Sequence, residues 1–134
     1  MVISIEKGKK DVKRIYAKEI EKSAKKNLKE FIAQTISPEA NIKTDAFSSY
    51  RSLEKEVANL KTEKKGENFD RMHRIIMGIK SWLRTTHGHA KYLQSYLDEY
   101  CYRFNRHLMK EGIFENLMRR MIPVSPMTYR QIIN

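Results

Sequence analysis

The spacing of apolar residues changes once along this chain, near Glu67, and that change decides the class of fold. Before Glu67 the apolar residues form short runs separated by turns, which is typical of strands with helices between them. After Glu67 they recur at helical spacing in successive stripes. We therefore predict one α/β domain over residues 1–134, with a mixed part first and a helical block at the end.

The part before Glu67 predicts strands and helices in alternation. Runs of apolar residues flank a turn at Gly8, so they predict a hairpin. Ser23 is a suitable N-cap for a helix, and Ser37-Pro38 ends that helix. In chain order we expect strands over 2–6 and 13–20, a helix over 23–35, a strand over 41–45, a helix over 48–56 and an edge strand over 59–65.

Three apolar stripes predict the helical block. They run over residues 69–83, 92–104 and 113–121. A loop over 85–89, which contains Gly88, separates the first two, and prolines break the chain before the tail 127–134. The third stripe consists of Ile113, Phe114, Leu117, Met118 and Met121.

The charge of the chain indicates a polyanionic partner. Lys and Arg number 27 against 16 acids, which gives a formal net charge of +11. Such an excess most often serves nucleic-acid binding, although a ribosome-associated protein or a basic solubility surface would have it too. Both halves are basic, with 16 basic and 10 acidic side chains over 1–66 and 11 and 6 over 67–134, so no single tail is responsible.

Several classes of protein are excluded by composition. No apolar run approaches the roughly 18 residues that span a membrane, and the first residues are too short and too charged for a signal peptide. The single cysteine, Cys101, allows neither a disulfide framework nor a zinc ribbon. We expect a protein of the reducing cytoplasm.

Asp45 is the first candidate for a functional side chain, because it ends the strand expected over 41–45. Ligands and metals gather at the carboxyl ends of strands in open α/β sheets. An aspartate at a strand end also commonly caps a helix or forms a turn. The residue pattern alone leaves both interpretations open.

A basic helix is the second candidate. His73 and Lys80 are seven residues apart, which places them about 20° apart on one side of a helix. Arg71, Arg74 and Arg84 lie on the same segment, and no acid stands between Arg71 and Arg84. The segment suits contacts with DNA phosphates, and the histidine suits a metal or a phosphate. A solvated helix face would have the same composition.

The remaining polar and aromatic groups have ordinary explanations. His87 and His89 lack a third ligand at metal-site spacing, which favours a loop. Tyr92, Tyr96 and Tyr100 recur every four residues, which suits a helix core or stacking on bases.

Asp98 and Glu99 resemble a carboxylate pair but point in different directions on a helix. Glu99 is expected to pair with Arg103. Cys101 is expected to be a buried thiol.

The order of these residues resembles a known family. Residues 42–50 are similar to the T-D-x-x-x-x-Y block of insertion-sequence transposases of the ISXO-like, DDE-type class. Residues 73–83 resemble the next block, in which a lysine follows the third catalytic position by seven residues. Residues 87–106, with Y-L-D-E-Y and then R-F-N-R, resemble the long signature that follows, and residues 127–130 resemble the C-terminal end.

The resemblance implies DNA transposition by a ribonuclease-H-like domain that holds two divalent ions, Mg²⁺ or Mn²⁺. Asp45 matches the second catalytic carboxylate. His73 stands where most members carry Glu, and an imidazole suits Mn²⁺ better than Mg²⁺. Lys80 matches the lysine that places DNA, so the implied catalytic residues are Asp45, His73 and Lys80, with Asp45 and His73 as metal ligands.

One departure from the family concerns its first catalytic aspartate. That residue lies on a strand ahead of residues 2–6, and this sequence starts after that strand. Glu6 falls on the second strand and is no replacement. The family's upstream zinc ribbon is absent as well. We therefore expect a partial ribonuclease-H-like fold, a short mixed sheet without its first strand followed by a helical block.

Three hypotheses stay open. The first is a transposase fragment that is inactive alone because it lacks the first aspartate. The second is an active enzyme whose N-terminal segment is supplied by another polypeptide or by frameshifting; its partners would be that missing segment or, by self-association, further copies of the chain. The third is a non-catalytic DNA-binding or regulatory fragment that competes with an intact transposase. All three have DNA as the partner, and we favour the first.

Overall fold

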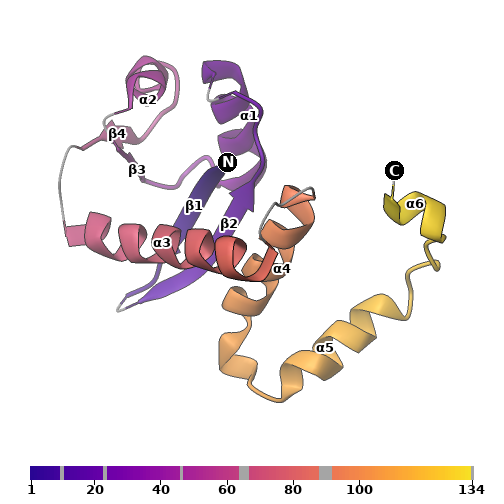
Figure 1. Cartoon of the computed structure of the whole chain (residues 1–134). Helices are drawn as coiled ribbons and strands as arrows, with labels where there is room; N and C mark the ends of the chain where they lie inside the picture. Colours follow the sequence, from indigo (N-terminus) through magenta and orange to yellow (C-terminus); the bar gives the residue numbers. More distant parts are fainter. Residues whose placement is uncertain (10, 23, 46, 64–66, 88–91, 134) are drawn as a thin grey trace.

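The computed structural model of the chain describes residues 1–9, 11–22, 24–45, 47–63, 67–87 and 92–133. It is a mixed α/β structure with two small sheets, followed by helices, as the change of pattern near Glu67 predicts (Figure 1). None of the helices described is both long enough and apolar enough to cross a membrane.

The first two strands form the predicted hairpin. Strand β1 (Val2–Lys7) pairs antiparallel with β2 (Val12–Lys18), with Ile5 opposite Ile15. The turn is closed by the Gly8 amide, which donates to the Asp11 carbonyl at 2.7 Å. A Cβ on Gly8 would lie 2.8 Å from that oxygen, so the tight turn requires glycine.

Helix α1 (Lys25–Thr35) follows the hairpin and turns one apolar side inward. Its buried residues are Leu28, Phe31 and Ile32, at the expected helical spacing. Ala24 occupies the N-cap and gives no side-chain hydrogen bond, while Ser23, the expected cap, lies outside the described residues. The chain leaves the helix at Ile36, in extended conformation, just before Ser37-Pro38.

The second sheet is a parallel pair. Strand β3 (Ile42–Thr44) and strand β4 (Leu60–Thr62) are joined by α2 (Ser48–Leu53) and pair in register, with Ile42 opposite Leu60. Helix α2 ends earlier than expected, because Glu56 and Val57 both donate to the Leu53 carbonyl and the chain turns there. The edge strand expected over 59–65 is confirmed over Leu60–Thr62.

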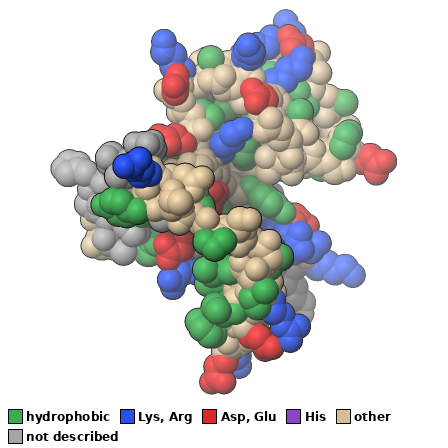
Figure 2. All heavy atoms as spheres, turned by 90° about the vertical axis from the view of Figure 1, so that its right-hand side faces the viewer, with side chains coloured by type: hydrophobic (Ala, Val, Ile, Leu, Met, Phe, Trp, Pro, Cys, Tyr) green, Lys and Arg blue, Asp and Glu red, His purple; other side chains and the backbone are tan. Residues whose placement is uncertain are grey.

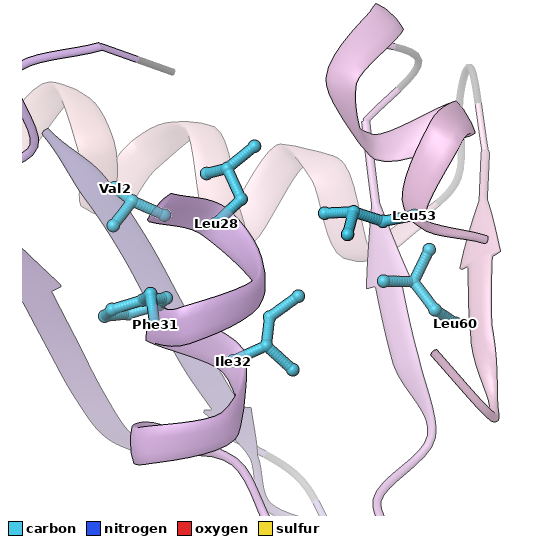
Figure 3. Close-up of a cluster of buried hydrophobic side chains, with 6 residues drawn as sticks. All are labelled: Val2, Leu28, Phe31, Ile32, Leu53 and Leu60. Atoms are coloured by element: carbon cyan, nitrogen blue, oxygen red, sulfur yellow. The ribbon is translucent and has the colours of Figure 1, made fainter. Parts of the chain in front are cut away.

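Instead of one mixed sheet, the described chain forms two separate two-stranded sheets, β1–β2 and β3–β4. A shared core joins them from the side of α1 (Figure 3). It consists of Val2 from β1, Leu28, Phe31 and Ile32 from α1, Leu53 from α2 and Leu60 from β4. The two sheets therefore belong to one packed unit even though no hydrogen-bonded ladder connects them among these residues.

The two long helices pack on the hairpin around a second core. Helix α3 (Glu67–His87) and helix α4 (Leu93–Asn105) contribute Ile79 and Leu97, which are fully buried with Ile15 of β2. The prediction that a loop begins at residue 85 is wrong, because α3 continues to His87. The Thr85 hydroxyl donates to the Ser81 carbonyl at 2.9 Å, and no glycine or proline interrupts the helix there. Gly88 and His89 lie outside the described residues.

The chain ends in an extended arm, residues 107–133. It comprises the 3-10 helix η1 (His107–Met109), α5 (Gly112–Met121) and α6 (Tyr129–Ile133). Figure 1 shows α5 and α6 leading away from the rest of the molecule. The helix predicted from the third stripe is confirmed, whereas α6 falls in the tail, where no element was predicted. No residue of α5 is buried.

Candidate functional site

Asp45 lies where the sequence placed it, directly after β3. Its side chain is exposed, and Oδ1 accepts a hydrogen bond from the Phe47 amide at 3.3 Å. This bond turns the chain into α2, so the turn-forming interpretation holds for the structure. Asp45 also borders a hollow of about 200 Å³, which is lined by Met1, Val2, Ile20, Leu28, Asp45, Phe47 and Tyr50.

The surroundings of Asp45 are partly buried. Burial raises the pKa of the Tyr50 hydroxyl, and the negative charge of Asp45 raises it further, so Tyr50 stays protonated beside the carboxylate.

Thr44 precedes Asp45 and stands opposite Thr62 in the β3–β4 register. Both threonine hydroxyls are buried, and neither has a hydrogen-bond partner within the described structure. Such groups are uncommon in a completed fold.

The basic residues of α3 lie on its solvent side. Ile79 has no exposed surface, and the side of α3 around it packs on the hairpin. His73, Lys80 and Arg84 are exposed and fall within about 40° of one another on the helix. Arg71 and Arg74 are exposed as well, but helical geometry places them on the other side of the core-facing line. The predicted DNA-binding set therefore divides into two edges of α3.

Among the described residues, Asp45 and His73 do not belong to a complete metal site. In the ranges that the structure describes, no three His, Cys, Asp or Glu side chains come together in a group that could hold a metal ion. Two-metal sites need several carboxylate oxygens in one place. The described residues therefore do not fit a complete divalent-metal site.

A comparison with protein families decides the class of protein. Residues 1–105 match the family described as "ISXO2-like transposase domain". The chain belongs to this family of DDE transposases. The family function is DNA transposition, which implies DNA as the partner and a divalent metal as cofactor. Neither a curated protein nor a solved structure shows significant similarity to the chain.

The matched region of this transposase includes all the candidate residues and ends where α4 ends. Asp45, His73 and Lys80 lie within it. The arm of residues 107–133 lies beyond it. The resemblance seen in residues 42–50, 73–83 and 87–106 is therefore confirmed at the level of the family, and the roles of individual residues stay predictions.

Two amide side chains of the transposase domain perform a task that sequence reasoning missed. Asn105 Oδ1 accepts from the Ile15 amide at 2.7 Å, and Nδ2 donates to the Ile15 carbonyl at 2.9 Å. Gln94 accepts from the Glu19 amide at 2.8 Å and donates to the Ala17 carbonyl at 3.3 Å. Together the two side chains hydrogen-bond backbone groups of Ile15, Ala17 and Glu19 along the outer edge of β2. No strand pairs with this edge in the described structure.

The sequence signal for this role is polar amides set at either end of an apolar helix stripe. Asn105 belongs to the R-F-N-R segment, so part of that signature holds α4 to the hairpin. This is a structural role rather than a contact with DNA or metal.

The aromatic and acidic residues of α4 also have structural roles. Tyr100 is half-buried, with its ring centroid 5.3 Å from that of Trp82 and 6.5 Å from that of Phe104, which supports the core interpretation over base stacking. Glu99 pairs with Arg103 at 2.8 Å, as predicted. Cys101 is half-buried, and burial raises the pKa of its thiol, so it is not a reactive thiolate.

Proposed function

We propose that this chain is the catalytic part of a DDE transposase in which Asp45 is a metal-binding carboxylate. The observation that carries the proposal is the position of Asp45, directly after a parallel strand and inside the region that matches the family. The carboxyl ends of parallel strands are where such folds place their ligands. The hydrogen bond from the Phe47 amide to Oδ1 of Asp45 holds the carboxylate in place.

The fold that we propose is ribonuclease-H-like, formed by residues 1–134 as one domain that another strand completes. Two small sheets share one core, and β1 and β3 each have a hydrogen-bonded neighbour on one edge only among the described residues. A strand between β1 and β3 would join them into one mixed sheet. The unpartnered hydroxyls of Thr44 and Thr62, close to Asp45, support a missing neighbour in this part of the molecule.

The metal site that we propose combines residues of this chain with ligands from elsewhere. Asp45 and His73 are the two candidates, and the remaining carboxylates come from outside the described residues. Because His73 would supply an imidazole nitrogen, the completed site should favour Mn²⁺ over Mg²⁺ more than a site with three carboxylates does.

The DNA-binding surface that we propose is the solvent side of α3. Lys80 and Arg84 share one edge with His73, and Arg71 and Arg74 form the other edge. Cations on both edges of one helix suit the two phosphate backbones that border a groove. Lys80 is the catalytic lysine in this proposal because it lies in the same helical column as His73, two turns further along α3.

A plasmid-nicking assay tests the proposal. The chain would be incubated with supercoiled DNA and Mg²⁺ or Mn²⁺, alone and fused behind the N-terminal part of another ISXO2-like transposase. We expect nicking by the fusion only, and its loss in Asp45→Ala and His73→Ala. Glu39→Ala, which removes an exposed carboxylate from a turn, is the matched control and should nick normally. Full nicking by the Asp45→Ala fusion would refute the role of Asp45.

A second function is favoured by the absence of a three-ligand group among the described residues. In this alternative the chain binds DNA without cutting it and competes with an intact transposase. It requires that the fusion shows no nicking with either metal while the chain alone binds DNA with an affinity that falls steeply with salt. Binding that does not change with salt would exclude it.

A further inference from the structure

The turn end of the β1–β2 hairpin, residues 6–14, is basic and projects from the molecule. From residue 7 to residue 14 the chain has five basic side chains and one acid, Asp11. The basic side chains that are exposed in the described structure are Lys7, Lys9, Lys13 and Arg14. Figure 1 shows this hairpin end extending past α3. A concentration of positive charge on a projecting element indicates a polyanionic ligand.

Basic side chains elsewhere on the molecule are more often balanced by acids. Lys25 and Lys29 of α1 share the carboxylate of Glu56. Arg103 and Arg119 each pair with the glutamate four residues earlier on the same helix. Figure 2, which looks at the molecule from the side of the arm, shows Lys and Arg side chains interspersed with acids on that face. Such pairs must open before their cations can bind a phosphate.

The hairpin end keeps cations that no acid neutralises. Lys13 pairs with Glu6 at 2.9 Å. Within the described structure, Lys7 and Lys9 belong to no ion pair. Both side chains are exposed, so they can bind a phosphate without first losing a partner.

A β-bulge adds to the positive charge at the same place. The register of the hairpin shifts between Glu6 and Lys7, which makes Lys13 an extra residue on β2, while Arg14 lies opposite Glu6. A hydrogen bond with the Tyr16 side chain and the charge of Glu6 raise the pKa of the Arg14 guanidinium. Lys13 and Arg14 therefore both interact with one carboxylate, although adjacent residues of a regular strand point to opposite faces. Glu6 balances one of the two charges, and a net positive charge remains.

We propose that the hairpin end binds the phosphate backbone of duplex DNA as a contact separate from α3. Lys7 and Lys9 bind phosphates, and the net charge at Lys13 and Arg14 adds to the attraction. A two-stranded ribbon fits the major groove, which is about 12 Å wide, because its strands lie only about 4.8 Å apart. The inference rests on the proposed function for its partner, DNA, and assigns a second surface to it.

The residues of the hairpin end favour duplex DNA, bound through its backbone. Proteins hold single strands by stacking bases on aromatic side chains, and residues 6–14 contain none. The next aromatic residue, Tyr16, is half-buried against the core that α1 shares with the two sheets. Residues 6–14 also lack Asn and Gln, the side chains that read adenine. Binding should therefore depend little on base sequence.

The salt dependence of DNA binding by the full chain tests the proposal. Replacing both Lys7 and Lys9 with Ala should lower the slope of log affinity against log salt by about 2, equally for duplexes of unrelated sequence. Replacing both Lys55 and Lys110 with Ala removes the same charge from exposed positions outside the hairpin and α3, and should leave the slope nearly unchanged. Fluorescence anisotropy over a salt series gives the slopes. Equal slopes for the two double variants would overturn the proposal.

Removal of the acid tests the hairpin end in the opposite direction. The Asp11 side chain is exposed, and the turn is closed by the Asp11 backbone carbonyl, so Asp11→Asn should keep the turn. Loss of its negative charge should strengthen DNA binding about twofold at low salt. Glu39→Gln makes the same change in net charge on another exposed turn and should leave the affinity unchanged. No gain in Asp11→Asn would contradict a phosphate contact at the hairpin end.

Comparison with α3 separates this inference from the proposed function. Joining the hairpin substitutions to Lys80→Ala and Arg84→Ala should lower the slope by about 4, because the two surfaces bind different phosphates. If the α3 substitutions lower the slope and the hairpin substitutions do not, the inference fails and the proposed DNA surface on α3 stands. A chain that shows no salt-dependent binding to DNA would refute both.

Discussion

The body of the molecule, residues 1–105, and the arm, residues 107–133, use the same kind of apolar periodicity in opposite ways. In the body, Ile79 of α3 and Leu97 of α4 have no exposed surface. In the arm, Phe114 of α5 is 67% exposed. The family match covers the first region and stops before the second. An apolar stripe thus indicates a contact surface on a helix, and only the structure shows whether the chain itself buries that surface.

The largest expected difference between the two regions is in their response to truncated leucines. Leu97→Ala opens a cavity in the core between α4 and the hairpin and should lower the free energy of unfolding by about 3 kcal/mol. Leu117→Ala in α5 should change it by less than about 0.5 kcal/mol at low protein concentration. Urea unfolding followed by Trp82 fluorescence measures both. Equal losses would mean that the arm packs on the body.

The amides that join α4 to β2 give the next largest effect. Asn105→Ala removes two hydrogen bonds and leaves the partly buried amide and carbonyl of Ile15 without these partners. The substitution should lower the free energy of unfolding by about 2 kcal/mol. Asn116→Ala removes the hydrogen bonds from the Tyr102 hydroxyl and Arg106 Nε, so it should loosen the contact between α4 and α5 without lowering the stability of the body. Hydrogen exchange at the Ile15 amide distinguishes the two. Unchanged protection of that amide in Asn105→Ala would contradict this role.

DNA binding should also distinguish the body from the arm. Replacing both Lys80 and Arg84 with Ala should lower the slope of log affinity against log salt by about 2. Replacing both Arg119 and Arg120, which lie on α5, makes the same change in charge and should leave the slope nearly unchanged. Fluorescence anisotropy with a labelled duplex over a salt series gives both slopes. If the arm variant shows the larger drop, the phosphate contacts lie on the arm.

The smallest effect is a pH dependence confined to the body. Lys25 and Lys29 of α1 hydrogen-bond the Glu56 carboxylate and hold its pKa below the ordinary value of 4.5. Its contribution to stability is therefore present above pH 4.5 and is lost as the pH falls through the lower pKa of the folded state. Glu56→Gln should flatten the fall in stability below pH 4.5. An unchanged acid profile would mean that other carboxylates dominate.

Most of the helices and strands could be predicted because their signals are local. The hairpin follows from alternation around Gly8, and α1 follows from the spacing of Leu28, Phe31 and Ile32 before a proline. The end of α3 differs from the prediction because Thr85 and Thr86 favour helices only weakly, yet α3 includes both and the Thr85 hydroxyl bonds to the Ser81 carbonyl of the same helix. The division into two sheets and the clamp by Asn105 depend on contacts between distant segments, which periodicity does not contain.

The candidate site shows the same limit. The sequence placed Asp45 after a strand and His73 in line with Lys80 on a helix, and the structure agrees with both positions. A metal site needs ligands from several distant segments, and local sequence patterns do not contain that arrangement; the described residues form no group of three such ligands.

The most direct test of this account is a Mn²⁺ titration of the isotope-labelled fusion with the N-terminal part of an ISXO2-like transposase, followed by NMR. A bound paramagnetic ion broadens the signals of nearby residues. We predict that the amide of Phe47 and the imidazole of His73 broaden together at the lowest Mn²⁺ concentrations, and that Asp45→Ala abolishes the effect at both. Broadening that begins elsewhere, or at only one of the two positions, would contradict a shared metal site at Asp45 and His73.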